Sequence, residues 1–165
     1  MVQPFDIRPF QPADLPAMQE IRRLAFGPVF QSFRDIVGEE IGEVAFADAD
    51  AEQSRLLETL CGTGSGHQVF VVTVSDEVVV GFVTFSLDQK KQVGEIGLNA
   101  MHPVHAGQGI GAAMYAFVLE RMKSAGMKVA TVGTGGDPSH APARRAYEKV
   151  GFGPAIPSVS LYRLL

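Results

Sequence analysis

The sequence predicts a mixed α/β (α+β) domain built on a central, mostly antiparallel sheet. Three observations support this: β-rich runs joined by short turns, a later alternation of strand and helix patterns, and a hydrophobic content of 46%. A chain of 165 residues with this content can bury one substantial core. We therefore expect a single domain over residues 1–165.

The first part of the chain starts with a strand pattern and then changes to helical spacing. Phe5 to Arg8 is typical of a short strand, and Asp14 precedes a run of apolar residues at helical spacing. The segment from Phe26 to Ala47 is ambiguous. Asp48 to Leu60 again predicts a helix, which ends near Gly62.

Three β-rich runs follow, and only short polar turns separate them. They are Val69–Val74, Val78–Leu87 and Val93–Met101, joined by SDE and DQKK. Connections this short join neighbouring antiparallel strands, so these runs predict a meander.

Helices and strands alternate in the last part of the chain. Apolar residues at helical spacing predict a helix over Gly109–Ala125, and Lys128–Val132 predicts a buried strand. Asp137 followed by Pro138 is typical of a helix start, and that helix should continue to about Lys149. Val159–Leu164 predicts a final strand.

Composition and charge exclude several classes of protein. No apolar run approaches the ~18 residues of a membrane span, and MVQPFDIRPF lacks the pattern of a secretion signal. The net charge of -4 gives no basic footprint for nucleic acid. Cys61 is the only cysteine, so no internal disulfide forms and no metal spacing arises. We expect a cytoplasmic protein with no metal, membrane or nucleic-acid partner.

Acidic residues are concentrated in one segment. From Asp35 to Glu58 there are eight acidic side chains and one basic one, Arg55. Such a cluster is either a solvated helix face or an entrance that attracts a cationic substrate.

A glycine-rich turn lies between the third meander strand and the following helix. In HPVHAGQGIGA, glycine occupies every second position, at Gly107, Gly109 and Gly111. A helix start offers free N–H groups and a partial positive charge, which suits an anion such as phosphate. Neither a P-loop nor a dinucleotide fingerprint fits, because no Gly-Lys-Ser/Thr follows and Ala112 stands at the third glycine position. Close packing of the helix on the sheet would explain the glycines equally well.

Together with this turn, HAPARRAYEKVGF resembles the GNAT superfamily of N-acetyltransferases, which bind acetyl-coenzyme A. The family's Gln/Arg-x-x-Gly-x-Gly/Ala pattern is matched from Ala106 to Gly111, with alanine at the first position. Its later signature is matched by Ala143, Tyr147, Lys149, Gly151 and Phe152, with His140 in place of the usual asparagine.

The resemblance implies a GNAT fold with six to seven strands, about four helices and splayed strands at the cofactor site. It also implies that acetyl-coenzyme A lies along the third meander strand and over the glycine turn, so that the backbone N–H of Asn99 stabilises the developing oxyanion. The implied cofactor-binding residues are Asn99, Met101, Ala106, Gly107, Gln108, Gly109, Gly111, Ala112, His140 and Tyr147.

Two side chains are candidates for proton transfer. By its position, Tyr147 resembles the tyrosine that protonates the departing thiolate in many relatives; the alternative is a packed helix tyrosine. Glu95 lies eleven residues before Ala106, as the catalytic glutamate does in some histone acetyltransferases of the superfamily. Alternation in the strand would place Glu95 on one face with Gly97 and Asn99, opposite Ile96 and Leu98. The alternative is an ordinary exposed carboxylate.

Three functions fit these residues. The first is acetyl transfer from acetyl-coenzyme A to a small, cationic amine. The second is acetylation of a protein lysine or N-terminal amine, and the third is a non-catalytic module that senses acetyl-coenzyme A. The presence of both Glu95 and Tyr147 favours an enzyme, since binding alone requires neither. The apolar end VSLYRLL could also join two copies into a homodimer.

Overall fold

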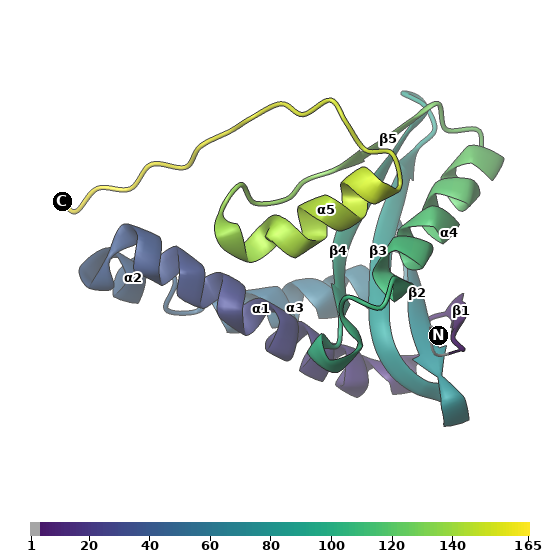
Figure 1. The fold of residues 1–165 in the computed structure, drawn as a ribbon, viewed down its shortest axis with the longest axis horizontal. Coiled ribbons are helices and arrows are strands. Elements are labelled where there is room, and N and C mark those ends of the chain that lie inside the picture. Colours follow the sequence, from purple (N-terminus) through teal and green to yellow (C-terminus); the bar gives the residue numbers. More distant parts are fainter. Residues whose placement is uncertain (1–3) are drawn as a thin grey trace.

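A computed structural model describes residues 4–165 as a five-stranded sheet with helices on both faces (Figure 1). The strands are β1 (Asp6–Pro9), β2 (His67–Val74), β3 (Val78–Asp88), β4 (Val93–Met101) and β5 (Val129–Val132). The helices are α1 (Leu15–Val37), α2 (Glu39–Ala45), α3 (Ala49–Cys61), α4 (Ile110–Ser124) and α5 (Ala141–Lys149). None of the helices in this part of the chain is long and apolar enough to cross a membrane.

The strands lie side by side in sequence order, from β1 to β5. The first three pairings are antiparallel and the last, between β4 and β5, is parallel. The predicted meander is confirmed, and so is the mixed fold with a mostly antiparallel sheet. Residues 4–165 contribute five strands rather than six or seven.

The predicted final strand, Val159–Leu164, is wrong. Residues 153–165 form no helix or strand and run from the end of α5 toward α2 (Figure 1). A strand needs a neighbour to accept and donate backbone hydrogen bonds, and this segment lies beside no strand of the sheet. Its anchor is Tyr162, whose ring centroid lies 5.6 Å from that of Phe46, whereas Leu161 is 90% exposed.

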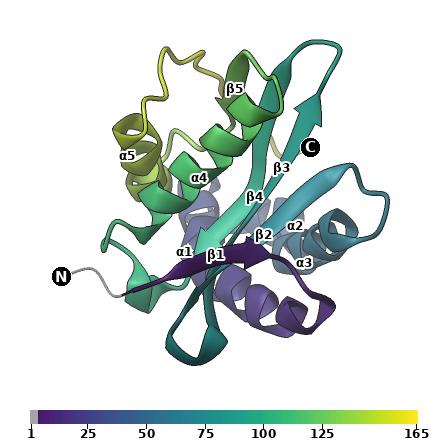
Figure 2. The same ribbon diagram turned by 90° about the vertical axis from the view of Figure 1, so that its right-hand side faces the viewer.

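Two hydrophobic cores lie on the two faces of the sheet. Met18, Ile21 and Leu57 of α1 and α3 pack on one face, against Phe82 among others. Residues of α4 and α5, including Met114 and Tyr147, pack on the other face with Phe85. Figures 1 and 2 show these two helical layers with the sheet between them.

Helix α1 extends through much of the segment that the sequence left ambiguous. It passes through Pro28, which lacks a backbone N–H, and ends at Gly38, whose φ of 87° suits glycine. Val29 is buried beside the proline, so packing holds the helix together at this point. The long helix thereby reaches beyond the sheet toward the loop that follows β5.

A β-bulge in β4 opens the sheet next to β5. Val83 pairs with Asn99, and Phe85 pairs with Ile96. Between these two pairs β3 advances by two residues and β4 by three, so β4 has one extra residue. The hydroxyl of Thr84 donates to the Leu98 carbonyl (2.9 Å) at the bulge. A Cβ at residue 97 would lie 2.7 Å from the same hydroxyl, so the close approach requires glycine there.

Beyond the bulge, β4 and β5 part. Their parallel pairing runs from Val93 with Val129 to Ile96 with Val132, whereas β4 continues to Met101. In the described part of the chain, the β5-facing edge of residues 97–101 therefore has no neighbouring strand.

Candidate active site

The free edge of β4 presents backbone groups of two predicted residues. The His102 N–H donates to the Val80 carbonyl (2.7 Å), which sets the alternation along the β3–β4 ladder. Ala100 is therefore oriented toward β3, and the N–H and C=O groups of Asn99 and Met101 point to the opposite side, into the gap. An extended ligand with amide groups could pair with this edge as an added strand would.

The side chain of Asn99 organises two buried tyrosines beside this edge. Its Nδ2 donates to the Tyr147 hydroxyl (3.1 Å) and to the Gly97 carbonyl (2.9 Å). The Tyr115 hydroxyl donates to Asn99 Oδ1 (2.7 Å). The two tyrosine rings are 4.5 Å apart between centroids. Strand β4 and helices α4 and α5 thus meet in one polar cluster.

These contacts give the two hydroxyl groups different properties. Burial, together with the neighbouring Tyr147, raises the pKa of Tyr115 well above its usual range, so Tyr115 stays a neutral donor to Asn99. The Tyr147 oxygen instead accepts a hydrogen bond from Asn99, and within residues 4–165 no hydrogen bond ties its own proton to a backbone or carboxylate group. Tyr147 can therefore donate that proton to a group placed in the gap.

The glycine turn leads into α4 with an uninterrupted row of free amides. Gly107 and Gly109 have φ angles of 75° and 84°, which glycine adopts without strain. The first backbone N–H of this region with a helical acceptor is that of Ala113, which donates to the Gly109 carbonyl (3.1 Å). Within the described chain the N–H groups of residues 107–112 have no acceptor, so they can bind an anion at the positive end of α4.

Glu95 does not share a face with Asn99, and that prediction is wrong. Ile96 packs in the core on the α4 and α5 side, and Asn99 contacts the tyrosines of the same two helices. Leu98, predicted to share a face with Ile96, packs in the opposite core. The bulge shifts the alternation by one residue, so exposed Glu95 points away from the tyrosine layer.

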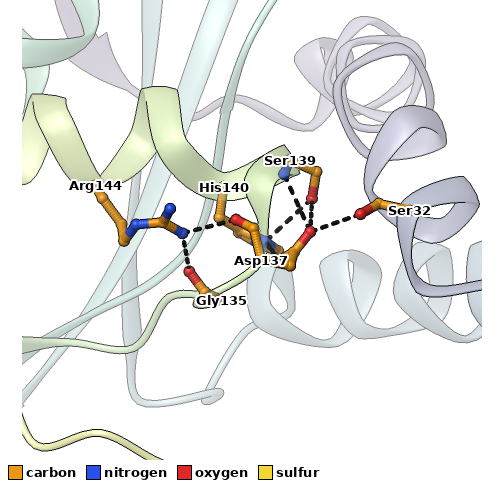
Figure 3. Close-up of polar contacts among 6 residues, drawn as sticks. All are labelled: Ser32, Gly135, Asp137, Ser139, His140 and Arg144. Carbon is orange, nitrogen blue, oxygen red and sulfur yellow. Dashed lines mark hydrogen bonds and ion pairs between the residues drawn. The ribbon is translucent and has the colours of Figure 1, made fainter. Parts of the chain in front are cut away.

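A second polar cluster lies where the loop after β5 meets α1, and its centre is Asp137 (Figure 3). One carboxylate oxygen contacts His140 Nδ1 at 2.6 Å, and the other accepts from the Ser32 hydroxyl at 2.8 Å. The backbone N–H of Ser139 (3.1 Å) and its hydroxyl donate to the same second oxygen. Nη1 of Arg144 donates to the carbonyls of Gly135 (2.5 Å) and Asp137 (2.8 Å).

This arrangement keeps Asp137 ionised. Burial opposes ionisation, but the hydrogen bonds from Ser139, His140 and Ser32 together hold the pKa of the carboxyl well below its usual range. The ring of His140 stacks on that of Phe33, with centroids 5.9 Å apart and planes 22° apart. His140, which the sequence predicts as a cofactor contact, thus joins the start of α5 to α1.

Other candidate groups have limited chemistry. No group of three or more His, Cys, Asp or Glu side chains among residues 4–165 could hold a metal ion. Burial raises the pKa of the Cys61 thiol to about 11, so this cysteine is a poor nucleophile near neutral pH.

A family comparison agrees with this geometry. The model of the Acetyltransferase (GNAT) family matches residues 19–152, which include the glycine turn, the tyrosine cluster and the Asp137 cluster. The chain belongs to the GNAT acetyltransferase family.

Solved structures share the GNAT fold at low sequence identity. A tetramutant of the BH1408 protein from Bacillus halodurans is 16% identical, with a TM-score of 0.73 over 96% of this chain and 99% of that chain. The ribosomal-protein-S18-alanine N-acetyltransferase of Escherichia coli is 16% identical, with a TM-score of 0.64 over 93% and 80%. An acetyltransferase of Trypanosoma brucei is 17% identical, with a TM-score of 0.59 over 97% and 100%. A search of curated proteins found no match.

Sequence reasoning missed three residues of this GNAT site: Tyr115, Asp137 and Ser32. Tyr115 lies among the apolar residues of α4 and is buried. A buried tyrosine hydroxyl requires a hydrogen-bond partner, and this requirement was the signal in the sequence that could have identified it. Asp137 was identified only as a helix cap. Its contact with Ser32 spans 105 residues, and no local pattern marks it.

Proposed function

We propose that this GNAT enzyme transfers the acetyl group of acetyl-coenzyme A directly to a primary amine, with a small cationic amine as acceptor. One observation carries the proposal: Asn99 holds the Tyr147 hydroxyl beside the free edge of β4, with its proton available to the gap. A thiolate released at this point would meet a proton donor. A donor at this position would assist acyl transfer from a thioester to an amine.

The residues around the gap fit the chemical parts of acetyl-coenzyme A. The amides of residues 107–112 suit its pyrophosphate, and the backbone of Asn99 and Met101 suits its pantetheine amides. Further contacts would come from Ala106, Gln108 and His140. When bound, acetyl-coenzyme A supplies an activated acetyl group, so the protein needs no nucleophile of its own.

Within this proposal, the backbone N–H of Asn99 faces the gap and would stabilise negative charge on the carbonyl oxygen. The Asn99 amide that donates to the Tyr147 oxygen would stabilise the phenolate left after Tyr147 protonates the thiolate. For the amine proton, the sequence suggests Glu95 as the acceptor. Its side chain has no hydrogen bond or ion pair within residues 4–165, so no contact there orients it.

Acidic groups near the end of α1 support a cationic acceptor. Asp35, Glu39 and Glu43 line a shallow pocket at the junction of α1 and α2, together with Gln31 and Arg34. This junction begins one turn beyond Ser32, which contacts the Asp137 cluster. A cation drawn to these carboxylates would arrive at the end of α1 that contacts the Asp137 cluster.

The acceptor is tested by thiol release from acetyl-coenzyme A across a panel of polyamines, amino-acid amides and lysine peptides at low and high salt. We expect turnover with small cationic amines and a fall in kcat/KM at high salt, since salt screens steering. The variant with Asp35, Glu39 and Glu43 changed to Asn, Gln and Gln should lose the salt dependence. Turnover with peptides alone would favour a protein acetyltransferase instead. Tight acetyl-coenzyme A binding without turnover of any acceptor would favour a sensor module.

A further inference from the structure

Two helices from opposite faces of the sheet meet at the Asp137 cluster. Helix α1 packs on one face and α5 on the other, yet Ser32 and Phe33 of α1 contact Asp137 and His140 before α5. Asp137 lies five residues beyond the end of β5, past the last pairing of β4 with β5. The loop that carries Asp137 therefore follows the point at which β4 and β5 part.

The contacts of His140 fix which ring nitrogen can accept a proton. Nδ1 lies 2.6 Å from a carboxylate oxygen of Asp137, which can only accept, so Nδ1 carries the hydrogen. Nε2 then holds a free lone pair and has no partner among residues 4–165. Within residues 4–165, His105 Nδ1 is the one buried side-chain nitrogen without a hydrogen-bond partner. Because Nε2 of His140 also lacks a partner but is not among the buried atoms, it is open to solvent.

His140 is the N-cap residue of α5, and Tyr147 lies within that helix. They are seven residues apart, which is close to two full turns and about 10 Å along the axis. The Tyr147 hydroxyl contacts Asn99 of β4, and a spacing of seven residues places His140 on the same side of the helix axis, two turns toward its start. Over this separation, a water molecule would have to link the reacting amine to Nε2 of His140.

We propose that His140, oriented by Asp137, accepts the proton of the incoming ammonium group through a water molecule. This inference rests on the proposed function and assigns a step of it. An ammonium group gives one proton to Nε2, and the neutral amine attacks the thioester carbonyl. The C–N bond forms and the C–S bond breaks. Tyr147 protonates the thiolate and is reprotonated by the second proton lost from nitrogen, while His140 returns its proton to solvent. The net products are an amide, free coenzyme A and one proton.

The charged groups that contact the Asp137 cluster or the end of α1 are engaged in other contacts. Asp137 contacts the ring itself. Arg144 of α5 is bound to loop carbonyls, and Nη2 of Arg34 on α1 donates to the Phe46 carbonyl (2.7 Å). Tyr162 of the C-terminal segment packs against Phe46. Glu95 points away from the tyrosine layer and lacks an orienting partner, so His140 is the better-positioned proton acceptor.

The decisive variant is His140→Asn, which introduces the residue of the family pattern at this position. Asparagine can still contact a cofactor but cannot take up a proton. We expect kcat to fall roughly 100-fold at pH 7 with unchanged KM for acetyl-coenzyme A and unchanged calorimetric binding of coenzyme A. The loss in kcat should become smaller as the pH approaches the pKa of the amine, ~10.4, because less of the amine is then protonated and in need of a base. His67→Asn, the same change at the start of β2, should keep the wild-type kcat.

Asp137→Asn tests the positioning role separately. Nitrogen-15 NMR should show the Nδ1–H form of His140 in the wild type and a loss of that preference in the variant, together with a lower kcat. If either variant fails to fold, His140→Gln provides the same test of proton uptake.

Each outcome separates the inference from the proposed function. An active wild type with an equally active His140→Asn variant, or a variant whose defect lies only in KM for acetyl-coenzyme A, would overturn the inference and leave the proposed function intact. A wild type that binds acetyl-coenzyme A but acetylates no amine would overturn both.

Discussion

Replacement of Tyr147 by phenylalanine removes one hydroxyl group and leaves the ring packing in place. Tyr147 is 6% exposed, and its ring lies between those of Tyr115 and Phe152, at centroid distances of 4.5 and 5.8 Å. The variant loses a single 3.1 Å hydrogen bond from Asn99, which typically costs about 0.5–1.5 kcal/mol of folding free energy. The protein should therefore still fold.

The kinetic effect of Tyr147→Phe should be much larger than its effect on stability. Loss of a general acid typically costs at least about 100-fold in rate, or roughly 2.7 kcal/mol of transition-state stabilisation. In an assay of free thiol at saturating amine, kcat should fall by about this factor while KM for acetyl-coenzyme A stays the same.

Tyr115→Phe is the matched control for this experiment. It removes the other hydroxyl of the same tyrosine pair, which donates to Asn99 instead of facing the gap. Its kcat should fall by less than about tenfold, the equivalent of one lost hydrogen bond. Equal defects in the two variants would refute a proton-donor role for Tyr147 and indicate that the network is only structural.

Three further predictions concern the bulge, an ion pair and the cysteine. Gly97→Ala should lower the unfolding free energy by about 1–3 kcal/mol in urea titrations, because its Cβ would lie 2.7 Å from the Thr84 hydroxyl; an unchanged midpoint would contradict the close approach. Asp14 accepts two hydrogen bonds from Arg8 (2.8 and 2.9 Å), which hold the pKa of Asp14 below its usual value, so Asp14→Asn should cost about 1.5–3 kcal/mol at pH 7. The difference in unfolding free energy should persist at pH values above the ordinary aspartate pKa of about 3.9. It should disappear as the pH falls through the lower pKa that Asp14 has in the folded protein; a constant difference down to pH 2 would show that the charge is irrelevant. Cys61, with its pKa raised to about 11, should resist iodoacetamide at pH 7, and Cys61→Ser should retain full turnover; rapid alkylation of the folded protein would contradict its burial.

The elements with local signals were the predictable part of the fold. The meander followed from apolar runs and short polar turns, and α4 and α5 followed from helical spacing with a glycine turn or an Asp-Pro start. Helix α1 could not be followed past Pro28, because proline usually ends a helix and the packing of Val29 that maintains it is tertiary. The C-terminal segment has strand-like residues, but it lies beside no strand in this fold.

The candidate site divides in the same way. The glycine turn and the position of Tyr147 were evident from sequence, since each depends on neighbours along the chain. The orientation of Glu95 was not, because the bulge at Gly97 and Leu98 depends on Thr84 in another strand. The Asp137 cluster likewise depends on contacts with α1 that no sequence periodicity predicts.

The central claim is direct acetyl transfer to an amine, and mass spectrometry of the reaction tests it most directly. Wild-type protein, acetyl-coenzyme A and a mixture of cationic amines should yield an N-acetylated amine and an equal amount of free coenzyme A, while the protein mass stays that of the unmodified chain. A stable acetylated protein, or release of coenzyme A without any acetylated amine, would contradict the account.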